Sequence, residues 1–186
     1  MVRDFGEPLS VASTRRFDRR TYGSPREFFE DIFFATRNMR RSRRLTRGKE
    51  MPAAFRERIM LAVTSVYGCR YCSWVHTREA LRNRVEADEI SSLLTGSVDG
   101  CPEEEAVALL YAQHWADSDG RPDPEAVRRV EEAYGSEKAQ AIEVLLHMIR
   151  LGNLAGNTWD RFVHRISFGR LGGARRGYPS VHLGQN

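Results

Sequence analysis

The sequence predicts an all-α protein, a single-domain helical bundle of about seven helices. Three observations lead to this prediction. Apolar residues recur at helical intervals, and no segment alternates apolar and polar residues as a half-buried strand does. Glycines and prolines divide the chain into pieces of helical length. The 186 residues suffice for one domain with its own core, and a composition of 41% hydrophobic and 29% charged residues is typical of a globular protein.

The chain divides into three parts. Residues 1–25 are polar and interrupted by glycine and proline, and we expect an irregular N-terminal arm that lies over a neighbouring surface or subunit. Residues 26–166 hold the expected helices. Residues 167–186 are glycine-rich and basic, and we expect them to form a C-terminal tail.

Local signals mark the start and end of each expected helix. Ser24 and Pro25 match an N-cap followed by a proline at the first helical position, and the helix they begin has a wide apolar face that we expect to be packed. Gly68 and Gly135 each separate two apolar segments, as a glycine does after a helix. The later helices are expected over residues 53–67, 69–83 and 86–95, from Pro102 through Trp115, from Pro124 to Tyr134, and from about Glu137 to Ile166.

Six arginines gather between Arg37 and Arg47. No aromatic residue lies among them to stack on bases, and acidic residues are spread through the chain, so we do not expect nucleic-acid binding. We interpret the cluster as a solvated helix end, where cations face the negative end of the helix dipole. An acidic partner protein is the other use that such a cluster allows.

Two features indicate where the protein resides. No segment approaches the roughly 18 apolar residues of a membrane span, and the first residues lack the apolar core of a signal peptide. We therefore expect a cytoplasmic protein that does not enter membranes. Its three cysteines cannot form a disulfide scaffold, so a close pair is expected to be redox-active or metal-binding.

That close pair is Cys69 and Cys72, and His76 follows it. A Cys-x-x-Cys motif is typical of a redox dithiol or of half a zinc site. A second cysteine pair is absent, although Cys101 or His114 could complete a site outside the usual spacing. A thioredoxin-type dithiol would need strands, which the sequence does not predict. A helical dithiol with a histidine on the same face remains, because the three residues have i, i+3, i+7 spacing.

The spacing also suggests how the residues could work together. Cys72 and His76 are i, i+4 neighbours with β-carbons about 5–6 Å apart, so His76 can influence Cys72 more readily than Cys69. If the chain reverses at Gly68, Glu57 comes to about the height of His76. Glu57 would then orient the imidazole, which would take a proton from Cys72. Cys69, near a helix N-terminus, would have its own pKa lowered.

These residues resemble a known family. Glu57, Cys69, Cys72 and His76, together with the segments 61–65 and 68–72, resemble the alkylhydroperoxidase D branch of the carboxymuconolactone decarboxylase superfamily. The resemblance covers about residues 53–83. A weaker likeness lies around Asn153 and Asn157, which resemble the late helix of some members of the family.

The resemblance implies an all-α fold that forms homo-oligomers. It implies that Cys72 attacks a peroxide, that Cys69 then closes a disulfide with it, and that Glu57 and His76 relay protons. The sequence departs from the well-studied hydroperoxidases at Tyr71, where they carry a further histidine.

We therefore expect a thiol–disulfide oxidoreductase with hydroperoxide reductase activity that needs no metal or organic cofactor. Its substrate would be a hydroperoxide or a disulfide, and its reductant an unidentified thiol protein. Two alternatives stay open. One is a redox-sensing binding or regulatory module without turnover, and the other is a zinc-binding structural protein.

Overall fold

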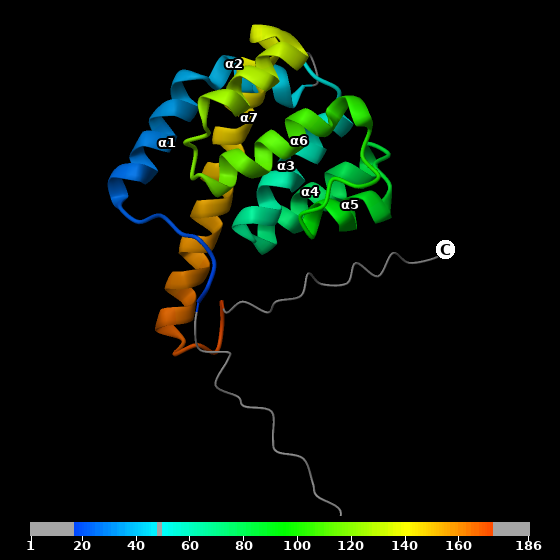
Figure 1. The fold of residues 1–186 in the computed structure, drawn as a ribbon. Helices are drawn as coiled ribbons and strands as arrows, with labels where there is room; N and C mark the ends of the chain where they lie inside the picture. The colour runs from blue at the N-terminus through cyan, green and yellow to red at the C-terminus, as the bar shows by residue number, and fades with distance from the viewer. Residues whose placement is uncertain (1–16, 48–49, 173–186) are drawn as a thin grey trace, which may run out of the picture.

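A computed structural model describes residues 17–47 and 50–172 of the chain. These residues form helices and loops without any strand, which confirms the predicted all-α class. Residues 1–16 of the expected arm and 173–186 of the expected tail lie outside the described part. The seven helices of the described part are α1 (Pro25–Arg37), α2 (Met39–Thr46), α3 (Ala53–Tyr67), α4 (Arg70–Arg82), α5 (Ala87–Leu94), α6 (Glu103–Asp117) and α7 (Pro124–Ile166) (Figure 1).

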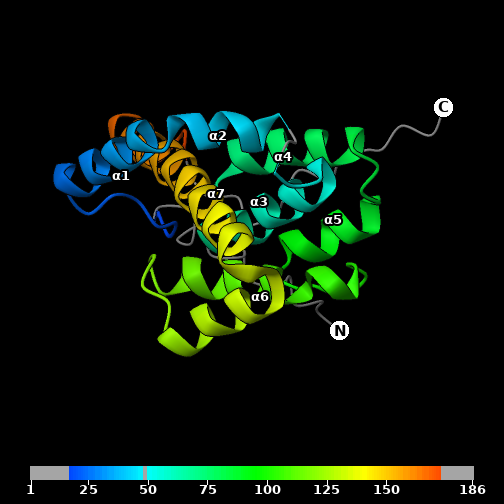
Figure 2. The ribbon, with the colours of Figure 1, turned by 90° about the horizontal axis from the view of Figure 1, so that it is seen from above.

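Helix α3 lies at the centre of the fold. All its side chains from Ile59 to Thr64 are buried, because this run is apolar around nearly the whole helix. It contacts α4, α5, α6 and α7. Seen from above, α7 and α5 lie on opposite sides of it (Figure 2). A polar side chain on α3 is therefore removed from water, and the Glu57 residue is only 3% exposed.

The chain reverses between α3 and α4. Gly68 ends α3 in the left-handed conformation, with φ of 68° and ψ of 27°, and its N–H donates to the Thr64 carbonyl. Glycine adopts this conformation without a steric penalty, so it suits the position after a helix. Helix α4 begins two residues later and packs against α3. The predicted helix break at Gly68 is confirmed, and the reversal on which the position of Glu57 depended is present.

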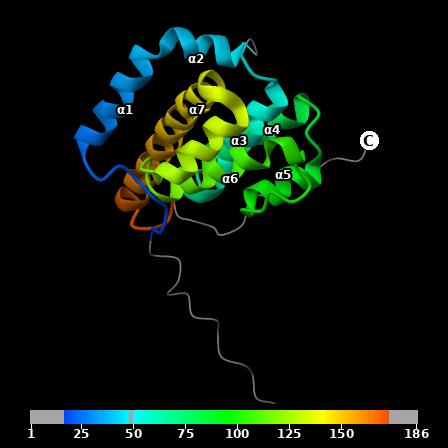
Figure 3. The same cartoon turned by 45° about the horizontal axis from the view of Figure 1, so that its top comes forward.

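Helix α7 consists of two helical segments joined at Gly135, where φ is 76° and ψ is 157°. The sequence predicted this division. The longer second segment contacts α1 and α2, which form an arc along its outer side (Figure 3). Its C-terminal end extends beyond the other helices, and residues 17–24 run beside it (Figure 1). No helix in the described residues, α7 included, is both long and apolar enough to cross a bilayer.

Two expectations for the N-terminal helices need correction. The arginine cluster is not the end of one helix, because Asn38 leaves the helical conformation and its side chain caps Phe34, so a separate helix α2 follows. The apolar face of α1 is only partly packed: Phe29 and Phe33 are 65% and 66% exposed. Helix α1 instead buries Asp31, which pairs with Arg150 of α7.

Candidate dithiol site

The four residues predicted for the site lie on α3 and α4. Cys69 is the N-cap residue of α4, Cys72 lies in its first turn, and His76 follows one turn later. Glu57 is in the early part of α3. The reversal at Gly68 brings its Oε2 atom to 2.8 Å from Nδ1 of His76. The two cysteines are free thiols, and a hydrogen bond joins their sulfurs.

Glu57 fixes the imidazole of His76. Burial acts to raise the pKa of Glu57, but the hydrogen bond and charge of His76 outweigh it, together with Arg56, so the pKa lies below its ordinary value. Arg56 donates from Nε to the other carboxylate oxygen over 3.0 Å. An ionised carboxylate only accepts hydrogen bonds, so Nδ1 of His76 carries a proton. Nε2 is then the ring atom that can accept one.

The two sulfurs differ in charge and in exposure. The hydrogen bond that Cys72 donates, together with the backbone N–H groups of Cys72 and Tyr71 and the charge of Arg19, lowers the pKa of Cys69 despite its burial. The same hydrogen bond and burial raise the pKa of Cys72. Cys69 is fully buried, whereas Cys72 is half-buried. These opposite directions favour the thiolate at the buried sulfur and the protonated thiol at the accessible one.

The sequence predicted effects on both cysteines, a lowered pKa for Cys69 and a proton transfer from Cys72 to His76. The lowered pKa of Cys69 at the helix N-terminus was predicted from the sequence, and the structure confirms it. Among the described residues, no hydrogen bond joins His76 to either sulfur. The structure thus forms two separate pairs: Glu57 of α3 with His76 of α4, and Cys69 with Cys72 at the start of α4.

Two glycines of α7 lie against the sulfurs. A β-carbon built on Gly152 would lie 3.7 Å from Sγ of Cys72, and one built on Gly156 would lie 2.8 Å from Sγ of Cys69. Their i, i+4 spacing places both on one face of the helix. Sγ of Cys69 therefore occupies space that a side chain at Gly156 would need, whereas a β-carbon at Gly152 would make only ordinary contact with Sγ of Cys72.

Two buried asparagines of α7 hold this face in place. Asn157 donates from Nδ2 to the carbonyl of Tyr67, the last residue of α3, over 2.8 Å. Asn153 donates from Nδ2 to Oγ1 of Thr64 over 3.2 Å. Both asparagines are fully buried. They fix α7 to the end of α3 immediately before the dithiol. The two asparagines of the weaker sequence likeness therefore have a structural role.

Charged residues that the sequence did not predict support the site from several elements. Asp160 of α7 is 1% exposed and forms ion pairs of 2.8 Å with Arg19 and with Arg70. Arg56 likewise supports Glu57. Arg56 and Arg70 are sequence neighbours of predicted site residues, which is a weak signal. Arg19 and Asp160 are distant in the sequence, and only the fold brings them together.

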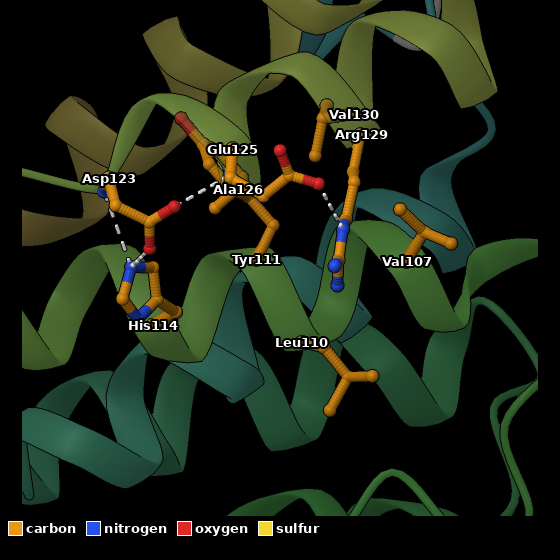
Figure 4. Close-up of a pocket in the computed structure, with 9 residues that line it drawn as sticks. All are labelled: Val107, Leu110, Tyr111, His114, Asp123, Glu125, Ala126, Arg129 and Val130. Carbon is orange, nitrogen blue, oxygen red and sulfur yellow. Dashed lines mark hydrogen bonds and ion pairs between the residues drawn. The ribbon is translucent and has the colours of Figure 1, made fainter.

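A separate hollow of about 420 Å³ lies between α6 and the first segment of α7 (Figure 4). His114, which the sequence offered as a zinc ligand, contacts Asp123 there over 2.9 Å. No residue of α3 or α4 lines the hollow, so it is not part of the dithiol site. Its lining residues are Val107, Leu110, Tyr111, His114, Asp123, Glu125, Ala126, Arg129 and Val130.

Cys101 stands apart from the dithiol. It is half-buried at the start of α6, where burial and the nearby Glu89 raise its pKa to about 12. Its thiol is therefore protonated at neutral pH. Within residues 17–47 and 50–172, no three His, Cys, Asp or Glu side chains form a group that could hold a metal ion.

Comparison with known proteins finds a family model that matches part of the chain. Residues 34–114 match the sequence model of the carboxymuconolactone decarboxylase family, and this range contains Glu57, both dithiol cysteines and His76. Neither the curated proteins nor the solved structures contain a match. Residues 34–114 of this chain are therefore similar to the carboxymuconolactone decarboxylase family.

Proposed function

We propose that the protein is a thiol–disulfide oxidoreductase that reduces hydroperoxides, of the alkylhydroperoxidase D type. One observation carries the proposal: two hydrogen-bonded free cysteines open α4, and His76, which is paired with Glu57 of α3, lies one turn further along α4. The family includes decarboxylases and peroxidases. A paired dithiol favours the second activity, because a decarboxylation has no use for two adjacent thiols.

The oxidative half of the reaction begins at Cys72, the more accessible sulfur. Its thiol gives up a proton to Nε2 of His76, and the thiolate attacks an oxygen of the hydroperoxide. The O–O bond breaks, the alcohol leaves with a proton, and Cys72 becomes a sulfenic acid. The Cys69 thiolate then attacks Sγ of Cys72. Hydroxide is expelled and takes up a proton to leave as water, and a Cys69–Cys72 disulfide remains.

The reductive half needs an external dithiol. Its thiolate attacks one sulfur of the disulfide, a mixed disulfide forms, and its second thiol then releases the protein dithiol. The two electrons that reduced the peroxide thus come from the external dithiol, which leaves as a disulfide. A thiol protein or a small dithiol would fill this role.

The decisive experiment measures peroxide consumption with several dithiol reductants. Cys72→Ser should abolish turnover, and Cys69→Ser should stop it after a single oxidation. Cys101→Ser is the matched control, because its thiol is protonated and outside the site, and it should turn over normally. Mass spectrometry after one equivalent of peroxide should show a loss of about two daltons in the peptide containing Cys69 and Cys72. Undiminished turnover in Cys72→Ser would contradict the mechanism.

The same experiment separates the two alternatives. A redox-sensing module would form the disulfide but consume no further peroxide with any reductant. A zinc protein would contain about one zinc per chain by metal analysis and resist oxidation of the pair.

We also propose that the protein forms homo-oligomers. Large apolar side chains are exposed on α1, α4 and the end of α7, including Phe29, Phe33, Trp74, Trp159 and Phe162. Patches of this kind commonly mark an interface. Light scattering of the purified chain tests the proposal, and a monomer at all concentrations would reject it.

A further inference from the structure

Arg19 reaches the dithiol from outside the family domain. It lies in the segment before α1, and only 10% of its side chain is exposed. Its stem lies over the chain reversal, because a β-carbon on Gly68 would be 3.6 Å from both Cγ and Cδ of Arg19. Gly68 directly precedes Cys69, so the folded N-terminal segment covers the buried end of the dithiol.

Four contacts hold the guanidinium in place. It donates to Oδ1 of Asn157 over 3.1 Å and to the Gly172 carbonyl over 3.0 Å. It pairs with Asp160 over 2.8 Å and lies 4.7 Å from the centre of the Phe17 ring. Its Nε is buried and has no hydrogen-bond partner among the described residues. An unpaired buried N–H is costly, so this atom is a donor available to an anion.

Two arginines and one buried carboxylate lie together near the start of α4. Arg19 and Arg70 share a single buried carboxylate, that of Asp160. The three groups therefore carry one surplus positive charge. Arg70 is half exposed and water screens its charge, so the surplus acts mainly at buried Arg19, whose charge contributes to the lowered pKa of Cys69. Cys72 is the titratable group hydrogen-bonded to Cys69, and its raised pKa keeps it protonated at pH 7.

We propose that Arg19 is a positioning residue of the dithiol: the N-terminal segment brings its cation to the buried sulfur, keeps Cys69 as a thiolate, and makes Cys69 the leaving group when the disulfide is reduced. The inference rests on the thiol–disulfide chemistry of the proposed function. An incoming thiolate attacks Sγ of Cys72, the S–S bond breaks, and the electron pair goes to Cys69. A thiol that is stabilised as the thiolate leaves faster.

The charge of Arg19 also influences the redox potential of the Cys69–Cys72 pair. Stabilising the thiolate favours the reduced protein, which makes the disulfide more oxidising. Removing the cation should therefore make the dithiol more reducing. Removing the carboxylate of Asp160 should have the opposite effect, because the positive charge of the arginines is then less neutralised. If Arg19 and Asp160 had only a structural role, replacing either one would shift the redox potential in the same direction.

The experiment measures the thiolate titration of the reduced protein by its ultraviolet absorbance, in a Cys101→Ser background. Arg19→Gln should raise the midpoint by about one pH unit, Asp160→Asn should lower it, and Arg19→Lys should lie between Arg19→Gln and the parent. Arg20→Gln is the matched control, since it removes the same charge one residue away, where the side chain contacts Ala116 and Asp117. Its midpoint should not move.

A glutathione redox titration gives the second readout. Arg19→Gln should shift the dithiol–disulfide equilibrium about tenfold, which is about 30 mV towards more negative potentials. An unchanged midpoint in folded Arg19→Gln, or an equal shift in Arg20→Gln, would overturn the proposal. If Arg19→Gln does not fold, Asp160→Asn decides the matter, because an unchanged or raised midpoint there would also overturn it. Neither readout uses peroxide, so a protein without peroxidase activity could still satisfy this inference while the proposed function fails.

Discussion

Replacement of Gly156 by alanine tests whether the buried sulfur is packed against α7. Alanine in a helix interior normally stabilises a protein by about 0.5–1 kcal/mol relative to glycine. At Gly156 the added β-carbon would lie 2.8 Å from Sγ of Cys69, which is closer than carbon and sulfur can approach. Cys69 has only its χ1 angle to turn, and it is fully buried. Overpacking of this kind costs about 1–3 kcal/mol.

Gly152 provides the matched control on the same helix face. A β-carbon there would lie 3.7 Å from Sγ of Cys72, an ordinary van der Waals contact. Gly152→Ala should therefore be stabilising by about 0.5–1 kcal/mol. The helix-propensity term is common to both variants and cancels in their difference. The difference in the free energy of unfolding should be about 1–3 kcal/mol, with Gly156→Ala the less stable.

Chemical denaturation of the two reduced variants measures this difference, and thermal denaturation should show it as about 2–4 °C per kcal/mol. Function provides a second assay. If Cys69 turns away from the new methyl group, its sulfur leaves Cys72, and a disulfide requires the sulfurs to approach to about 2.05 Å. Disulfide formation after peroxide treatment should then be slower in Gly156→Ala than in Gly152→Ala. Equal stabilisation of both variants, with equal oxidation rates, would refute the packing argument.

Two further predictions concern the supports of the site. Glu57→Gln should slow peroxide turnover, because Nδ1 of His76 loses the carboxylate that fixes it. It should also flatten the acid side of the stability profile: the pKa of Glu57 is lowered in the folded protein, so its contribution is present at neutral pH and is lost as the pH falls through that lowered value. Urea denaturation between pH 7 and pH 3 measures this, and an unchanged slope would contradict it. Asn157→Ala should destabilise the protein by about 1–3 kcal/mol, because the buried carbonyl of Tyr67 loses its donor. Thr158→Ala, which removes only an exposed contact with Tyr22, should cost clearly less in the same assay, and equal losses would count against the buried hydrogen bond.

The sequence predicted those parts of the site that depend on local structure. Gly68 determines where α3 ends, and the rise of a helix then places Glu57 opposite His76. The predicted helix over residues 53–67 coincides with α3, because its cap residues and apolar run are local signals. Cys69 at the start of α4 follows from the same signals.

The remaining supports could not be predicted because they depend on which helices pack together. Nothing near Gly156 in the sequence indicates that a sulfur lies against it. Arg19 and Asp160 are ordinary charged residues until α7 and the N-terminal segment are placed side by side. The exposure of Phe33 was mispredicted for a related reason: apolar periodicity identifies a face that packs, but not whether its partner belongs to the same chain.

The thiolate is favoured at buried Cys69, whereas Cys72 is the accessible sulfur. This difference indicates which base removes the proton of Cys72. If the proton of Cys72 passed to Cys69, the peroxide step would leave Cys69 as a buried thiol. It could not then attack the sulfenic acid until it lost that proton again, and it is fully buried. Transfer to Nε2 of His76 avoids this difficulty, because the Cys69 thiolate remains ready for the second step. His76→Gln should accordingly slow the oxidation of Cys72 while leaving the thiolate titration of Cys69 nearly unchanged. Glu57 and His76 would then serve the accessible sulfur, whereas the start of α4 and Arg19 serve the buried one.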